Sequence, residues 1–376
     1  MKFLTTIIFI FIININYALS DTLYDALKIT YKNNKELNAE RENVSIAEQD
    51  LKISQSNYLP TGTITGSKSQ QNTKKLTNQS GGDATVNDVD PINTTIKLEQ
   101  TLIDFGRYAE LKKSQLGLNL SKEKLKKTEQ EIFYKAIEAY SNLIASIEKV
   151  DINEKNLNLL LRQAENDKNR LEIGQITLSD LSQSESSLAG AEAKNIKAIN
   201  DLTTSKLNYE NVVGKINDID DLNKSLNSIS PIPKSLNEAI ELSNKNNPNI
   251  IIAKIEYEQS EKDIKIARAD LAPTATLSIE RSNTEDFSST IDEKEQDTIK
   301  ATITWPFFSG GKNLAKINKN QREKIRKRLL LDNTIKSNET NIASAWSNFQ
   351  SSESILKSIK AQVNAAEIAN EGITEE

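Results

Sequence analysis

The sequence contains no cysteine and no histidine, and its only methionine is Met1. These absences exclude disulfides, thiol nucleophiles, zinc sites of the Cys/His type and a Ser-His-Asp triad. Catalysis by a pair of carboxylates, as in some hydrolases, remains possible because the chain has 53 Asp and Glu residues. We expect those residues at solvent-facing helix positions, which is their ordinary place. The sequence therefore predicts no enzymatic activity, no cofactor and no metal site.

Glycine and proline are also scarce, with 12 and 7 in 376 residues, whereas 27% of the residues are charged. This composition favours long helices over a compact, loop-rich domain. The formal net charge is −5, so the chain offers no electrostatic footprint for a nucleic acid. We expect no nucleic-acid partner.

The N-terminus has the pattern of a secretory signal peptide. A positive start at Lys2 precedes an almost purely apolar run from Phe3 to Ile13, and small residues at Ala18 and Ser20 suit cleavage after Ser20. The apolar run is too short for a comfortable transmembrane helix, although an uncleaved anchor is the alternative. Residues 1–20 are therefore predicted to be removed on export. No other stretch is apolar enough to span a membrane as a helix, so membrane entry would require strands closed into a barrel.

An internal repeat organises the remaining chain. The segment Leu23–Pro60 aligns without gaps with Leu236–Pro273, and ten positions are identical. A second match follows, because the sequence at 102–107 corresponds to that at 307–312. The period of about 210 residues is far longer than that of solenoid repeats. We therefore predict two tandem structural repeats, residues 21–230 and 231–376.

Each repeat reads as a helix that ends near a proline, two strands, and then a long helix. Polar loops are expected between the paired strands, at 69–93 and 283–296. The predicted bounds are helices 22–58, 107–172, 180–214, 235–271 and 309–371, and strands 61–70, 94–104, 273–282 and 297–307.

The predicted strands alternate between apolar and polar residues. Ile96, Leu98 and Leu102 share one side of their strand, whereas Lys97 and Glu99 lie on the other. A half-exposed antiparallel sheet of a soluble protein has the same pattern, so both interpretations are open at this point. Four strands cannot close a barrel by themselves, and symmetric copies would have to supply the missing strands.

The long helices predict an antiparallel coiled-coil hairpin. Apolar residues from Ile132 to Val150 follow a heptad spacing, and a strict seven-residue grid runs from Leu181 to Tyr209 with Asn195 as its one polar position. The helix over 107–172 would be about 100 Å long. A glycine, Gly174, lies between the two helices and is expected at the turn.

In this order, the elements resemble the TolC family of outer-membrane efflux and type I secretion channels. The resemblance spans essentially 21–376, and its specificity comes from the order of weak motifs in two copies. The resemblance rests on the helix starts Leu23…Asn34 and Leu236…Asn247, the prolines Pro60 and Pro273, the turns Ile103–Arg107 and Phe308–Lys312, and the hairpin turn Gly174–Leu181.

The resemblance implies an α+β membrane protein of the Gram-negative outer membrane with a periplasmic extension. In that family, each protomer of a homotrimer contributes four strands to one 12-stranded β-barrel and long coiled-coil helices to a periplasmic α-barrel. The implied partners are a periplasmic adaptor (a membrane fusion protein), an inner-membrane transporter and outer-membrane lipid. The implied function is a passive exit duct of a tripartite efflux pump or of a type I secretion system.

Within such a barrel, strand alternation assigns residues to faces as a set, because a slip of one residue would expose every charge to hydrocarbon. The lumen-facing prediction comprises Lys97, Glu99, Glu280 and Lys300. The lipid-facing prediction comprises Ile96, Leu98, Leu277, Ile279, Ile299, Ile303 and Trp305. We also expect aromatic residues where strands pass into helices to lie at the periplasmic membrane interface. These are Phe105, Trp305, Phe307 and Phe308, and for Phe105 simple corner packing is an equal alternative.

The hairpin turn is the expected adaptor contact, at the far end of the helices from the strands. Gly174 would end the first helix, and Thr177 or Ser179 would cap the second, with Asp180 near its positive end. Gln175, Ile176 and Leu178 would remain exposed for a partner. The alternative is a turn whose residues serve only to cap the two helices.

A secreted scaffold protein is the alternative to a channel. A periplasmic adaptor-like or other secreted coiled-coil scaffold, without channel activity, would also have a helical hairpin, but not two units with long helices. By the first repeat, the helix 309–371 should be followed by a turn and a returning helix. We expect the sequence to be a C-terminally truncated form in which the second tip is missing.

Overall fold

The computed structural model describes residues 22–75, 77, 79–82, 88–216, 222–223, 232–288 and 290–375. The predicted signal peptide, residues 1–20, lies outside the described residues. The chain divides into two compact units, of which the first comes from the first predicted repeat, whereas the second combines segments of both repeats. The first unit is Met1–Arg41 with Leu125–Pro231, and the second is Glu42–Lys124 with Ile232–Glu376.

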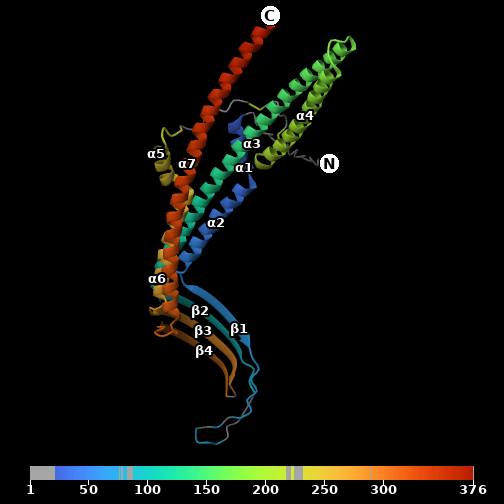
Figure 1. The fold of residues 1–376 in the computed structure, drawn as a ribbon. Helices are drawn as coiled ribbons and strands as arrows, with labels where there is room; N and C mark the ends of the chain where they lie inside the picture. Colours follow the sequence, from blue (N-terminus) through green and yellow to red (C-terminus); the bar gives the residue numbers. More distant parts are fainter. Residues whose placement is uncertain are drawn as a thin grey trace, which may run out of the picture. The chain divides into compact units, whose positions relative to one another are not determined.

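The second unit contains a four-stranded antiparallel sheet in the order β1-β2-β3-β4. Its strands are β1 (Thr61–Lys68), β2 (Ile92–Ile103), β3 (Thr274–Ser288) and β4 (Ile291–Thr304). Each repeat contributes two neighbouring strands, and β2 pairs with β3 across the repeat boundary (Figure 1). This pairing explains why the compact units differ from the sequence repeats.

The β3–β4 hairpin is longer than the sequence indicated. Residues 283–296 were expected as a polar loop, but pairing continues from Ser282↔Gln296 to Glu285↔Glu293 and ends at Ser288↔Ile291. Residues such as Thr284 and Lys294 are polar, so this segment lacks the apolar alternation from which a strand is predicted. The ladder supplies their backbone groups with partners, so a strand forms without an apolar face.

Helices adjoin every strand of the sheet. Helix α2 (Lys35–Ser56) leads into β1, α3 (Arg107–Glu172) follows β2, α6 (Pro248–Ala269) leads into β3, and α7 (Lys312–Glu375) follows β4. In Figure 1, α6 and α7 run side by side away from the same end of the sheet. Among the described helices, none combines the length and the apolar character needed to cross a membrane.

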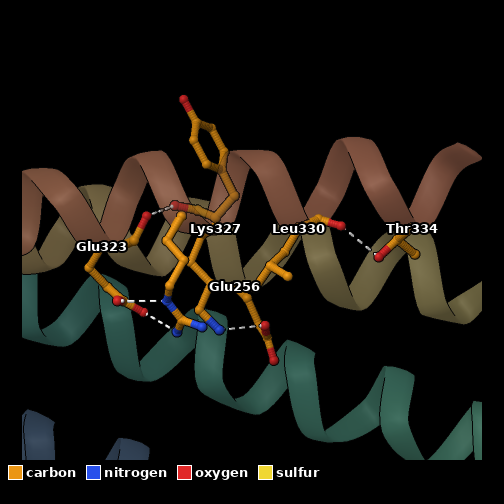
Figure 2. A network of polar contacts seen from close by, with 8 residues as sticks. Glu256, Glu323, Lys327, Leu330 and Thr334 are labelled. Carbon is orange, nitrogen blue, oxygen red and sulfur yellow. Dashed lines mark hydrogen bonds and ion pairs between the residues drawn. The ribbon is translucent and has the colours of Figure 1, made fainter.

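Ion pairs join α6 to α7. Lys327 Nζ lies 2.7 Å from Glu256 Oε2, as Figure 2 shows, and Lys324 Nζ lies 2.8 Å from Glu261 Oε1. The Lys324 side chain donates a hydrogen bond that holds the pKa of Glu261 below its ordinary value of 4.5. The lysine pKa is raised by the same contact. Acidic positions of α6 are thus matched by basic positions of α7.

The helices predicted over 22–58 and 235–271 are each interrupted, which corrects both predictions. In the first repeat, α1 (Leu23–Asn33) and α2 flank Asn34, whose ψ is 125°. In the second, α5 (Leu236–Asn246) and α6 flank Asn247, whose ψ is 118°. The amide of each asparagine caps the next helix, since Asn34 Oδ1 accepts from Leu37 N and Asn247 Oδ1 from Asn249 N.

The core of the first unit lies between α3 and α4 (Leu178–Val212). Tyr140 and Tyr209 are fully buried with ring centroids 6.3 Å apart, and Leu143 and Ala136 pack in the same cluster. The Tyr140 hydroxyl donates to the carbonyl of Asn223 over 2.9 Å. The heptad positions predicted from the sequence therefore form the seam of the helical hairpin.

Candidate functional site

The sheet register gathers the predicted lipid-facing residues on one face, which we call the apolar face. Residues directly opposite in an antiparallel pair share a face. Leu98 pairs with Ile279, which pairs with Ile299, and Ala275 pairs with Ile303. Ile96 and Leu277 have the same parity on their strands, and Trp305 continues the parity of β4 beyond its end. All seven predicted residues therefore share one side of the sheet.

The four predicted lumen-facing residues lie together on the opposite face, which we call the polar face. Lys97 pairs with Glu280, and Glu99 pairs with Ser278, which in turn pairs with Lys300. Lys97 and Glu99 also form an ion pair along β2. The other residues of this face in β3 and β4 are largely threonine and serine, which suits contact with water.

One detail of the apolar face was predicted incorrectly. The alternation of β2 placed Leu102 with Ile96 and Leu98, but a register shift between Thr101 and Ile103 puts Ile103 opposite Ala275. Such a bulge inserts one extra residue and reverses the parity beyond it. Sequence periodicity contains no signal for this insertion, because both Leu102 and Ile103 are apolar.

The apolar face ends at a row of charges that was not among the predicted site residues. Arg281 lies opposite Ile96 on β2 and Asp297 on β4. Its guanidinium is 3.4 Å from Asp297 Oδ1 and 4.0 Å from Glu295 Oε2. Both carboxylates share the parity of Ile299, so the boundary could have been found by extending the alternation into 283–296.

The predicted aromatic residues lie exposed where strands join helices. Phe307 and Phe308 are 83% and 80% exposed, and Phe105 and Trp305 are also exposed. The indole Nε1 of Trp305 donates to the carbonyl of Leu271 over 3.0 Å, just beyond the end of α6. This hydrogen bond fixes one edge of the ring to the protein and leaves the rest of its surface uncovered.

Arg107 at the β2–α3 junction has a structural role that its motif did not reveal. The residue is only 8% exposed, its Nη2 donates to the carbonyl of Thr101 over 3.0 Å, and its guanidinium lies 4.9 Å from the Tyr58 ring centroid. Asp104 Oδ1 accepts from the backbone N–H of Gly106 and of Arg107. The Asp-Phe-Gly-Arg turn thus caps α3 and ties β2 to the segment before β1.

The turn between α3 and α4 ends the first helix through its backbone. Gly174 has φ of 74°, a conformation that glycine adopts without strain. Gly174 N donates to Leu171 O, and Gln175 N donates to Arg170 O, each over 2.9 Å. These two bonds make a Schellman motif, so the sequence expectation for Gly174 agrees with the geometry.

Thr177 caps the second helix of the turn. The Asp180 backbone N–H donates to Thr177 Oγ1, and Asp180 Oδ2 accepts from the Thr177 backbone N–H over 2.9 Å, which completes a capping box. These hydrogen bonds, first that from the Thr177 backbone, lower the pKa of Asp180, and Arg170 contributes to the same effect. Of the two capping residues that the sequence left open, Thr177 and Ser179, the geometry selects Thr177.

The side chains expected to be free at the turn differ in exposure. Gln175 is exposed and Leu178 is 69% exposed, whereas Ile176 is half-buried. The expectation that Ile176 is exposed was therefore wrong. Below the turn, Ser184 Oγ on α4 donates to Asp167 Oδ2 on α3 over 2.6 Å. The turn is a rigid, doubly capped structure with an exposed leucine at its end.

A protein-family model matches most of the chain. The family described as "Outer membrane efflux protein" matches residues 26–215 and 239–371. These ranges include both compact units and most of every described helix and strand.

Individual relatives agree with the family match. The "Outer membrane efflux protein BepC" of Brucella suis biovar 1 is 27% identical over 362 residues, or 96% of this chain and 76% of BepC. The "Alkaline protease secretion protein AprF" of Pseudomonas aeruginosa is 20% identical over 284 residues, which are 74% of this chain and 59% of AprF. The solved structure of the outer-membrane channel OprN has a TM-score of 0.74 at 16% identity, and the match covers 91% of this chain and 77% of OprN.

Proposed function

Because the chain belongs to the outer membrane efflux protein family and is thus an outer-membrane exit channel protein, we propose how its own residues form the channel. The sheet spans the outer membrane with its apolar face toward lipid and its polar face toward an aqueous lumen. The channel is a passive conduit, serving a tripartite efflux pump or a type I secretion system, and catalyses no reaction.

The separation of residues between the two faces supports this orientation. Leu98, Ile279 and Ile299 form a continuous row across three strands, and Lys97 with Glu280 occupies the other face one residue away. A charge on the lipid side of a membrane strand costs about 2–4 kcal/mol near the bilayer midplane. The opposite orientation would place the four charged groups of the polar face in hydrocarbon, so only one orientation is energetically acceptable.

We propose further that three copies close the channel. The edge strands β1 and β4 leave backbone hydrogen-bonding groups without partners in an isolated sheet. Four strands are too few for a membrane barrel, and identical copies can join β4 of one to β1 of the next in antiparallel fashion. The number three comes from the resemblance to the TolC family.

We propose that the turn around Gly174–Asp180 contacts a periplasmic adaptor that belongs to an inner-membrane transporter. Its support is the combination of a rigid, capped backbone with an exposed apolar side chain, Leu178. An exposed leucine on a pre-organised turn can enter a partner's groove without a large entropic cost. Helix capping alone would explain why Gly174, Thr177 and Asp180 occur in this turn, but it would not explain the exposed Leu178.

Cysteine labelling tests the orientation of the sheet, since the chain has no native cysteine. We expect a membrane-impermeant maleimide to label Lys97→Cys and Lys300→Cys but not Leu98→Cys or Ile299→Cys in outer membranes. The two residues of each pair are neighbours on one strand, so they lie at nearly the same depth and differ in the face of the sheet they occupy. Labelling at 98 and 299 with protection at 97 and 300 would refute the assignment of faces.

Substitution at the turn tests the adaptor contact. We expect Leu178→Asp, alone or with Ile176→Asp, to leave assembly intact while reducing adaptor crosslinking and export. Ser179→Asp, at an adjacent exposed position of the same turn, serves as the matched control. Export that is unaffected by Leu178→Asp would mean that the turn has only a structural role.

A further inference from the structure

The two repeats form their β-hairpins in the same register. The internal repeat aligns β1 with β3 and β2 with β4. In the first repeat Thr61 pairs with Glu99, and the residues aligned with them, Thr274 and Thr304, pair in the second. The remaining pairs of the β1–β2 ladder recur in the same way. The repeat in the sequence is therefore also a repeat in backbone pairing.

A side-chain hydrogen bond at the helix–strand corners recurs as well. Gln100 Nε2 donates to the carbonyl of Tyr58 over 3.3 Å. Trp305 Nε1 donates to the carbonyl of Leu271 over 3.0 Å. Gln100 aligns with Trp305, and Tyr58 aligns with Leu271. The side chains differ, so the feature that the repeats share is the relative position of their backbones.

The two hairpins meet where β2 pairs with β3 (Figure 1). Leu98 pairs with Ile279 there, and Gln100 pairs with Leu277. Strand β4 is the counterpart of β2, and β1 is the counterpart of β3, but β4 and β1 are the edge strands of the described sheet. A β1 strand from another copy can therefore take the place on β4 that β3 takes on β2.

The β2–β3 register, transferred to β4 and a second copy's β1, gives definite residue pairs. Ile303 of one copy would lie opposite Gly66 of the next. Trp305 of the first copy would lie opposite Ile64 of the next. The transfer uses four aligned positions of the repeat, which are Leu98 with Ile303, Ile279 with Gly66, Gln100 with Trp305, and Leu277 with Ile64.

The transferred register joins like faces of the two sheets, although polarity was not used to obtain it. Ile303 and Trp305 belong to the apolar face, and Ile64 belongs to it because it pairs with Ile96. Gly66 lies two residues from Ile64 and so shares its face. A slip of one residue would join opposite faces, but a slip of two would not. The repeat therefore selects one register among those that polarity permits.

The side chains at the two edges also suit this register. Ile64 and Ile303 are each 76% exposed, and Trp305 is 63% exposed. No atom of the described chain lies within 4 Å of the place that a Cβ would occupy on Gly66. Ile303 can therefore lie across the glycine and cover its backbone, as large side chains do beside edge glycines. Trp305 opposite Ile64 is an aromatic and β-branched pair, a favourable combination across strands.

We propose that β4 of one copy pairs with β1 of the next in the register of the β2–β3 junction, with Ile303 opposite Gly66 and Trp305 opposite Ile64 of the next copy. This contact rests on the proposed homotrimer and adds the residues that meet at its seam. The stagger between hairpins is then the same within a copy and between copies. A closed barrel requires such a fixed stagger around its circumference.

Cysteine pairs across the seam test the register, since the chain has no native cysteine. Gly66→Cys in one tagged chain is combined with Ala301→Cys, Ile303→Cys or Trp305→Cys in a differently tagged chain. We expect copper-phenanthroline oxidation in outer membranes to join Gly66→Cys to Ile303→Cys at least several-fold more efficiently than to the other two. Directly opposite Cβ atoms lie about 4.5–5.5 Å apart, whereas a step of two residues displaces them by about 7 Å along the strand.

Ile64→Cys provides the matched series, in which the most efficient partner should move to Trp305→Cys. Because each chain has one cysteine, disulfides within a chain cannot contribute. A maximum displaced by two or more residues in both series would overturn the register but leave the trimer. Assembled oligomers in which none of the pairs forms a disulfide would do the same. Chains that remain monomeric in the outer membrane would instead refute the proposed homotrimer.

Fluorescence quenching provides a second, independent readout. We expect bimane attached to Ile64→Cys, in a Trp346→Phe background, to be quenched by Trp305 of the next copy, because tryptophan quenches bimane at short range. Within one copy, β1 and β4 are three strand spacings apart, or about 14 Å. Trp305→Phe should therefore restore the emission, and so should dissociation of the oligomer. Emission that is equal with and without Trp305 in assembled oligomers would contradict the pairing.

Discussion

Asn338 shows how a single buried amide can hold an interrupted helix in place. Its Oδ1 accepts from Asn247 Nδ2 over 2.6 Å and from Ser243 Oγ over 2.9 Å, and its Nδ2 donates to Asn244 Oδ1 over 3.1 Å. Asn338 is 7% exposed and lies on α7, so it joins that helix to the break between α5 and α6. A buried amide with all of these partners specifies one register between the elements.

At the residue scale, we predict that Asn338→Ala destabilises the fold by about 1–3 kcal/mol, because polar groups of Asn244 and Asn247 lose a buried partner. The urea midpoint of the chain in detergent measures the change. Asn333→Ala, an exposed site on the same helix, should change the free energy of unfolding by no more than about 0.5 kcal/mol. Equal effects of the two variants would contradict the network's role.

A second residue-scale prediction concerns the turn. Thr177→Ala should weaken the first turn of α4 by about 1 kcal/mol, since the Asp180 N–H loses its side-chain acceptor. Faster hydrogen exchange of the amides at 179–181 would report the loss. Ser179→Ala tests the alternative cap and should leave these exchange rates unchanged. A larger effect at Ser179 would show that the capping residue is misassigned.

At the scale of single elements, the proposed membrane sheet requires one face that contacts lipid and one face that contacts water. We predict that Ile299→Lys impairs outer-membrane assembly, with a cost of about 2–4 kcal/mol if the site lies near the bilayer midplane. Thr298→Lys introduces the same charge one residue away on the polar face and should assemble normally. Folded protein on unheated gels measures assembly, and an unaffected Ile299→Lys variant would argue against lipid contact.

The helix pair α6–α7 should respond to acid. The pKa of Glu261 is lowered by its hydrogen bond with Lys324, so the paired form stabilises the fold above the ordinary pKa of 4.5. That contribution is lost as the pH falls through the lowered pKa. Between about pH 6 and about pH 3, the melting temperature should therefore fall more for the unmodified chain than for Glu261→Gln.

The matched control for the acid response is Glu367→Gln, an exposed position of α7 without an ion pair among the described residues. This variant should follow the unmodified chain across the whole pH range. Because Glu261 is substantially exposed, the difference due to Glu261→Gln is expected to be small and to decrease with salt. A pH response identical in all three proteins would contradict the assignment.

At the scale of the whole molecule, the aromatic residues at the ends of the strands should mark one membrane boundary. In a Trp346→Phe background, Trp305 is the only tryptophan, because the chain has two. We predict that lipids brominated close to the headgroup quench its fluorescence more than lipids brominated at mid-chain. Trp305→Phe with Trp346 retained is the control, and quenching only at mid-chain depth would contradict the placement.

The periodic features of this protein could be predicted from its residues alone. Heptad spacing identified the α3–α4 seam with buried Tyr140 and Tyr209, and the period-two alternation separated Lys97 from Leu98. Helix 107–172 was predicted with the observed bounds, since no proline and one glycine interrupt it. These features are local, because each depends on the spacing of residues along a single element.

Tertiary structure decided what depends on pairing between distant segments. The bulge that places Ile103 opposite Ala275, the extension of β3 and β4 through 283–296, and the joining of both repeats in one sheet all follow from inter-strand hydrogen bonds. The break at Asn247 is stabilised by Asn338, which lies 91 residues away. A strand or helix end that is fixed by a distant partner produces no periodic residue pattern in the sequence. The reason is that its stability comes from the contact between the two segments.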